Sequence, residues 1–158
     1  GASTPYTCAD GAIYEADYGR TGGVVRTSSG EIADTDDDTL YHTRVVAPIG
    51  ESVTYSLTPP SGVTEMQIIG HFNEHYHQSA GQRFIDVWVE CPGSAPPWDT
   101  RQLVENRLDI FQEAGGGNIA LLRNWGTVDV SGGELVITIS ANADSPDAAL
   151  ISAIEYVY

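Results

Sequence analysis

The sequence predicts an all-β protein, an antiparallel β-sandwich of the jelly-roll type with one short helical turn. Three observations support this fold class. Apolar and polar residues alternate in short runs, which is the pattern of half-buried strands. Glycine, proline and aspartate separate these runs, as they do at turns. Only one stretch, LDIFQEAG (108–115), has the pattern of a helical turn, and Gly115 is positioned to end it.

The expected strands follow one another with short connections along the chain. In VTYSL (53–57) the alternation puts Val53, Tyr55 and Leu57 on one face. The same pattern recurs in later runs, so about nine strands can each bury one face against a second layer. The further expected strands are VVRT (24–27), LYHTRVV (40–46), MQIIGHF (66–72), RFIDVWVE (83–90), NIALL (118–122), GTVDV (126–130), ELVITIS (134–140) and ALISAIEYVY (149–158).

The length and composition indicate one folded domain over residues 1–158. A chain of 158 residues with 41% hydrophobic content can bury a proper core. No internal repeat divides it, and the proline-rich CPGSAPPWD (91–99) has the composition of an ordered loop. No apolar run approaches the roughly 20 residues that a membrane-spanning helix requires. We therefore expect no membrane insertion.

The charge balance argues against polyanionic partners. The chain has 22 acidic residues against 7 basic ones, for a net charge of −15, and every basic residue is an arginine. Such a surface repels phosphate backbones and anionic lipids. Nucleic acid is therefore an unsuitable partner. Adaptation to a high-salt habitat is an alternative origin of this composition and says nothing about activity.

Two cysteines, Cys8 and Cys91, lie far apart in the sequence and fit no C-x-x-C metal motif. They are either two buried thiols or one disulfide, and we predict the disulfide. A bridge closing a loop of roughly 80 residues would contribute about 4 kcal/mol on the chain-entropy model. Disulfides persist in oxidising compartments, so this prediction places the protein outside the cytosol, secreted or at the cell surface.

The stretch HFNEHYH (71–77) concentrates three histidines in seven positions. In an extended conformation His71, Asn73, His75 and His77 would share one face. Zinc could then bind to the two later histidines, with the first as a third ligand. An ideal strand separates His71 from His75 by ~13 Å, so a bend would be required. A metal site, a catalytic site and a ligand-binding edge are the three interpretations, and histidines without a metal are favoured over zinc.

The acidic run EIADTDDDT (31–39) could supply oxygen ligands to calcium, but it lacks the glycine and final glutamate of an EF-hand. A solvated acidic turn is the preferred interpretation, with no cofactor. The glycines of AGGGN (114–118) have no adjoining lysine, so a simple connection is expected there. No G-x-S-x-G motif occurs, and a carboxylate pair such as Glu74 and Asp86 is weak evidence in so acidic a chain. We expect no enzyme.

Several motifs in order along the chain resemble the malectin and malectin-like carbohydrate-binding domains. The combination is more specific than any one of its parts. The matching segments are YTCADG (6–11), Asp17 with Gly22 and Gly23, DTDDDTLYHTRVV (34–46), HFNEHYHQSAGQRFIDVWV (71–89), LDIFQEAGGG (108–117) and ELVITISANADSPDAALISAIEYV (134–157).

The resemblance implies a malectin-like β-sandwich that binds a neutral oligosaccharide or glycan without catalysis, as part of a larger secreted or surface protein. It implies aromatic platforms at Tyr41 and Tyr76, and His77 where the family has phenylalanine. It also implies a hydroxyl acceptor at Asp144. Asn73 and Glu74 are expected to support this ligand site. The alternatives are a structural or adhesive domain that binds neighbouring proteins and a metal-dependent enzyme built on the histidines.

Overall fold

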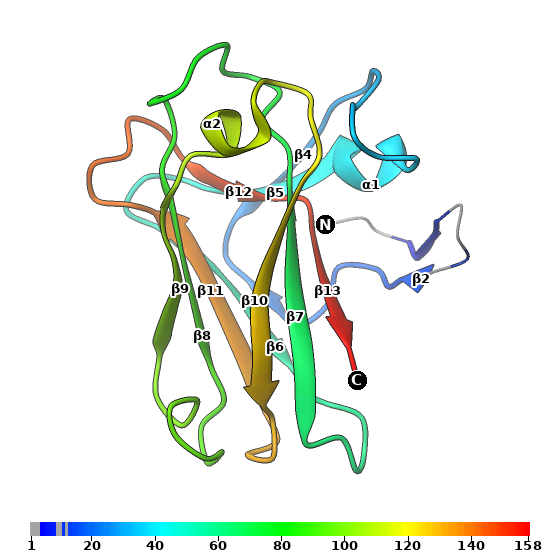
Figure 1. Ribbon diagram of the computed structural model, residues 1–158, viewed down its shortest axis with the longest axis vertical. Coiled ribbons are helices and arrows are strands. Elements are labelled where there is room, and N and C mark those ends of the chain that lie inside the picture. Colours follow the sequence, from blue (N-terminus) through cyan, green and yellow to red (C-terminus); the bar gives the residue numbers. More distant parts are fainter. Residues whose placement is uncertain (1–3, 9–10, 12) are drawn as a thin grey trace.

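The computed structural model describes residues 4–8, 11 and 13–158 (Figure 1). Its described part consists mainly of β-strands, with two short helices, α1 (Asp38–His42) and α2 (Ile110–Ala114). The strands are β1 (Tyr6–Thr7), β2 (Ile13–Tyr14), β3 (Arg20–Thr21), β4 (Val24–Thr27), β5 (Thr43–Ala47), β6 (Ser52–Leu57), β7 (Glu65–Phe72), β8 (Ile85–Glu90), β9 (Gln102–Leu108), β10 (Leu121–Asp129), β11 (Leu135–Ala141), β12 (Ala149–Ile151) and β13 (Ala153–Val157).

The strands form a β-sandwich, which confirms the predicted fold class. A five-stranded sheet has the order β3-β6-β11-β8-β9, and two three-stranded sheets have the orders β10-β7-β13 and β12-β5-β4. The named strands pair antiparallel throughout, and β1 with β2 forms a separate hairpin at one side (Figure 1). Residues of β6, β7, β8, β10 and β11 meet in one hydrophobic core. The strands of this core hold the ends of the loops that connect β7 to β8 and β11 to β12.

The predicted alternation of buried and less buried side chains is found in the central strands. In β6, Val53, Tyr55 and Leu57 are buried while their neighbours are not, and β11 shows the same pattern. The helical turn is also confirmed. The Asp109 side chain accepts the backbone N–H of Gln112 at the start of α2, and Gly115 ends the helix with φ of 80°. A left-handed residue of this kind favours glycine at a helix C-terminus.

Several local predictions were wrong. The single strand expected at 149–158 is two strands, β12 and β13, in different sheets. The expected strand 40–46 begins with helix α1, and only residues from Thr43 onward are extended. The two expected strands at 118–122 and 126–130 are one strand, β10, with an irregular register between Asn124 and Thr127. The edge strand β9 was not predicted, because its sequence QLVENRL has few apolar residues. Residues 102–108 form a strand because they pair with β8 at the edge of the five-stranded sheet.

The predicted disulfide between Cys8 and Cys91 is absent from the structure, so this prediction is corrected. Cys91 lies in the main core directly after β8, where its N–H donates to the carbonyl of Trp98. Cys8 belongs to the β1–β2 segment and lies near Tyr41 and His71 around a small cavity. The two thiols therefore have different surroundings, since Cys91 packs in the core of the sandwich and Cys8 lines the small cavity.

The described residues contain no helix long and apolar enough to cross a membrane.

Candidate functional site

A buried ion pair organises the loop that follows β7. The Glu74 side chain is 1% exposed, and its Oε2 accepts Arg83 Nε at 2.7 Å. Its Oε1 accepts the backbone N–H groups of Tyr76 and His77 at 3.0 and 3.1 Å. Burial alone would raise the pKa of Glu74, but the guanidinium and the two N–H groups outweigh it and hold the pKa below its usual value. The carboxylate is therefore ionised and fixes the loop.

This loop presents one aromatic ring to solvent. Tyr76 is 71% exposed, and its ring meets the His77 ring edge-on, with the centroids 5.1 Å apart. His77 Nε2 lies 2.8 Å from an Asp147 oxygen, which also accepts Arg83 Nη2 at 3.1 Å. Burial alone would raise the pKa of Asp147, but the backbone N–H of Ala148, together with Arg83 and His77, outweighs it and lowers the pKa. We call Tyr76, His77 and Asp147 the rim site.

The other predicted ligand residues lie away from the rim site or beneath the surface. Tyr41 in α1 is 2% exposed, and its hydroxyl lies 3.0 Å from His71 Nδ1. The Asp144 side chain is 75% exposed and pairs with Arg107 at 2.5 Å. The Asn73 side chain is buried, and its amide has no hydrogen-bond partner among the described residues. The structure thus brings Tyr76 and His77 together and leaves Tyr41 and Asp144 outside this contact.

The sequence interpretation missed Asp147 and Arg83. Asp147 stands three residues after Asp144 in the same loop between β11 and β12, so either could have been the loop carboxylate. The available signal for Arg83 was its rarity, because a chain with 7 basic residues among 158 has few cations to place.

The three histidines of the 71–77 stretch do not converge. Strand β7 ends at Phe72, so the later residues are not extended as expected. His71 contacts Tyr41 and Glu155, His75 contacts Arg44, and His77 contacts Asp147. No group of three potential metal ligands occurs among the residues that the structure describes, which include the acidic turn. In that turn Asp38 Oδ1 instead accepts the N–H of Ile32 at 3.1 Å.

The buried histidine should make the protein less stable in acid. Burial lowers the pKa of His71, although Glu155 opposes this effect. Below about pH 6.5 the unfolded chain binds a proton that the native state resists, so the free energy of unfolding falls with falling pH. We expect melting temperatures measured between about pH 7 and pH 5 to fall, and His71→Gln to reduce that slope. His42→Gln, at a more exposed ring, is the control, and an equal effect of both variants would contradict the assignment.

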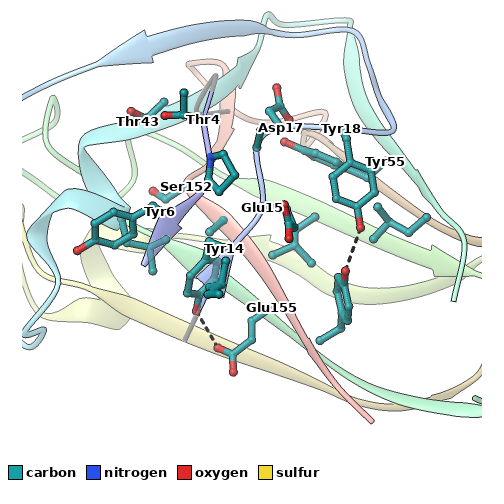
Figure 2. Close-up of a pocket in the computed structure, with 18 of the residues that line it drawn as sticks. Thr4, Tyr6, Tyr14, Glu15, Asp17, Tyr18, Thr43, Tyr55, Ser152 and Glu155 are labelled. Carbon is teal, nitrogen blue, oxygen red and sulfur yellow. Dashed lines mark hydrogen bonds between the residues drawn. The ribbon is translucent and has the colours of Figure 1, made fainter. Parts of the chain in front are cut away.

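A second feature is a cavity of about 560 Å³ between the N-terminal segment and β13. Figure 2 shows Tyr14 and Tyr18 of the N-terminal segment beside the residues of β13. The Tyr14 hydroxyl donates to Glu155 at 3.1 Å, and the Tyr18 and Tyr156 hydroxyls are 2.9 Å apart. The sequence interpretation missed this cavity, although six of the eight tyrosines line it. The available signal was the run YEADY (14–18), in which two tyrosines flank two acidic residues.

Several solved structures share the fold at low sequence identity. The extracellular domain of ANXUR2 from Arabidopsis thaliana is 13% identical, with a TM-score of 0.76, over 97% of this chain and 46% of that one. A structure described as plant peptide RALF23 in complex with FER and LLG2 is 13% identical, with a TM-score of 0.75. The match covers 98% of this chain and 46% of that one. Bacteroides uniformis beta-glucuronidase 2 is 16% identical, with a TM-score of 0.68. The match covers 99% of this chain and 17% of that one. The chain therefore spans less than half of each of these proteins.

The sequence itself identifies the family. No curated protein sequence matches the chain. A family model described as the malectin domain matches residues 1–154 of the 158, which is nearly the whole chain. The antiparallel sandwich agrees with this match, as do the solved structures of similar fold. The chain belongs to the malectin domain family.

Proposed function

We propose that this domain binds a neutral oligosaccharide at the rim site, without catalysis, as an extracellular part of a larger protein. The observation that carries the proposal is the exposed Tyr76 ring, on a loop whose backbone is held by a buried charge network. A pyranose presents apolar C–H groups on its faces and hydroxyls around its edge. A phenol ring has few rotatable bonds, so it covers such a face at a low cost in conformational entropy.

The neighbours of Tyr76 suit the hydroxyl groups of a sugar. His77 shares a hydrogen bond with Asp147 Oδ2, and Asp147 Oδ1 accepts from the Ala148 N–H at 2.7 Å. Because a carboxylate oxygen has more than one lone pair, Asp147 can also accept from a sugar hydroxyl. Asp144, on the same loop, is a second acceptor at the periphery. Asn73, Glu74 and Tyr41 are buried, so their proposed role is to support the loop rather than to touch the ligand.

The carboxylates considered for hydrolysis both have partners. Glu74 accepts hydrogen bonds from Arg83 and from two backbone N–H groups. Asp86 accepts from the Asn142 side chain at 2.9 Å and from the N–H of Arg107 at 2.8 Å. For Glu74 these contacts outweigh burial and hold the pKa below its usual value, which leaves little basicity for proton transfer. They support a binding domain rather than a glycosidase.

The test is calorimetric titration against a hit from a neutral-glycan array. We expect a Kd on the order of 10 μM to 1 mM and a loss of at least ~10-fold in affinity for Tyr76→Ala. Tyr158→Ala is the matched control, since Tyr158 is 69% exposed and lies outside the rim site. Loss of binding in Tyr158→Ala with full binding in Tyr76→Ala would overturn the rim site. An array without any neutral-glycan hit would overturn sugar binding.

The second candidate function is recognition of a protein or peptide neighbour. It is favoured by the likeness to a structure whose description includes the peptide RALF23 together with FER and LLG2. In that case Tyr76 would serve as an aromatic anchor, a residue type enriched at interface hot spots. This candidate would be favoured if the domain binds no glycan on the array but binds a protein partner, and if Tyr76→Ala weakens that protein binding.

A further inference from the structure

The cavity beside β13 has an aromatic wall built from both ends of the chain. Tyr6, Tyr14 and Tyr18 come from the N-terminal segment, and Tyr156 and Tyr158 come from the C-terminal end. The rings of the last two are stacked, with centroids 6.4 Å apart and an interplanar angle of 21°. The sixth tyrosine of the wall is Tyr55 in β6. We call this the tyrosine cavity.

The charged groups of this wall are all acidic. Glu15, Asp17 and Glu155 line it, and no Arg, Lys or His is among its described lining residues. Asp17 is neutralised by Arg20 at 2.5 Å, which leaves the other two carboxylates. A concave wall of one sign focuses the field, here within a protein of net charge −15.

The groups around Glu155 do not cancel its charge. It accepts from the Tyr14 hydroxyl at 3.1 Å and lies 3.0 Å from His71 Nε2. Burial lowers the pKa of His71, so that ring is neutral near pH 7. The pKa of Tyr14 is raised by burial and by Glu155, and that of Tyr156 is raised to about 12, first by its hydrogen bond with Tyr18. The phenols are therefore neutral, so neither they nor the imidazole place a positive charge against the Glu155 carboxylate.

Two buried oxygens on the wall also lack donors. Ser152 Oγ has no hydrogen-bond partner among the described residues. Asp17 Oδ1 has none of normal geometry, although its carboxylate contributes to raising the pKa of Tyr55. Buried acceptors without partners are costly, so a ligand that donates hydrogen bonds or carries positive charge would relieve them.

We propose that the tyrosine cavity binds an organic ammonium group, with Glu155 and Glu15 supplying the opposite charge and the tyrosine rings supplying the apolar wall. Aromatic rings attract ammonium groups through their electron-rich faces. The cavity volume of about 560 Å³ exceeds the size of a single such group, so it also accommodates the carbon skeleton that carries it. A neutral sugar would gain the ring contacts and hydrogen bonds to the carboxylates, but no charge–charge attraction.

The experiment uses choline as the probe and its neutral carbon isostere, dimethylbutanol, as the comparison. NMR titration of the tyrosine signals should give a Kd for choline on the order of 1 mM, with the neutral isostere at least ~10-fold weaker. Added salt should weaken only the choline complex, because ions screen the charge–charge attraction. Equal binding of the two probes, or no binding of choline at tens of millimolar, would overturn the proposal.

The variants locate the complex on this wall. Glu155→Gln keeps the hydrogen-bonding shape and removes the charge, and we expect choline to bind about 10-fold more weakly. Tyr18→Ala removes one ring, and Tyr76→Ala at the rim site is the control that should leave choline binding unchanged. Normal choline binding by both cavity variants would refute the site even if the protein binds choline elsewhere.

A blocked tripeptide with a central lysine distinguishes the two sources of an ammonium group. Tighter binding of the tripeptide than of choline would assign the site to a lysine side chain of a partner peptide. The reverse order would assign it to a small quaternary ammonium compound. Neither outcome depends on the rim site, so failure of glycan binding and failure of ammonium binding are separate results.

Discussion

Glu74→Ala is expected to lower the free energy of unfolding by about 3–5 kcal/mol, because it leaves a buried guanidinium without its main partner. Arg83 is 5% exposed, and among the described residues it would keep Asp147 and the carbonyl of Ala148 as partners. The same change frees the N–H groups of Tyr76 and His77, so the loop that presents the rim site should lose its shape as well. Chemical denaturation measures the first effect, and glycan titration below the melting transition measures the second.

The matched control is Asp144→Ala, which removes a carboxylate from another pair with arginine. That side chain is 75% exposed, and exposed pairs contribute about 0–1 kcal/mol. The double variant Glu74→Ala/Arg83→Ala should cost less than the sum of its single changes, since the second removes the charge that the first leaves unpaired. A loss below about 1 kcal/mol for Glu74→Ala would show that the buried pair does not hold the loop.

Trp125→Ala is expected to destabilise the protein by about 3–5 kcal/mol. The ring of this β10 residue is buried, packs edge-on against Phe72 at 6.2 Å and lies directly over Gly70 of β7. Its Nε1 also donates to Glu105 at 3.2 Å. The variant therefore creates a cavity where glycine offers no side chain to fill it, and it removes a donor from a buried carboxylate.

Trp88→Ala provides the comparison for that variant. Trp88 in β8 is half-buried and lies under the guanidinium of Arg101, 4.3 Å from the ring centroid, rather than in the core. The cation–π contact contributes about 1 kcal/mol, so Trp88→Ala should cost less than Trp125→Ala. Urea titration of both variants measures the difference in stability. Similar unfolding midpoints would show that the packing of Trp125 over Gly70 is not a major source of stability.

The sequence predicted the strands whose burial alternates, because that pattern is set by the pleat itself. It failed where a tertiary partner decides the outcome. Edge strand β9 contains Glu105, a buried carboxylate that no local rule would place inside. Its charge is accommodated by Arg123 of β10, 2.7 Å away, and by Trp125. These partners lie about 20 residues further along the chain.

The part of the rim site that could be predicted from the sequence is the pair of residues that are adjacent in the chain. Tyr76 and His77 adjoin in sequence and in space. The predicted alternation beyond Phe72 failed because the Glu74 carboxylate accepts the N–H groups two and three residues later, which offers the backbone a local alternative to the strand. The choice between Asp144 and Asp147 depends on a loop conformation set by Arg83, a residue about 60 positions away.

Hydrogen bonds between the N-terminal segment and β13 also constrain how the protein is made. The Tyr14–Glu155 and Tyr18–Tyr156 contacts join residues 141 and 138 positions apart. Chain segments emerge from the ribosome in order, so the first hairpin must wait for its partner strand until β13 has been synthesised. During that interval the tyrosines near the N-terminus are exposed to other proteins. Synthesis of this domain should therefore benefit from chaperones that shield aromatic segments until the last strand arrives.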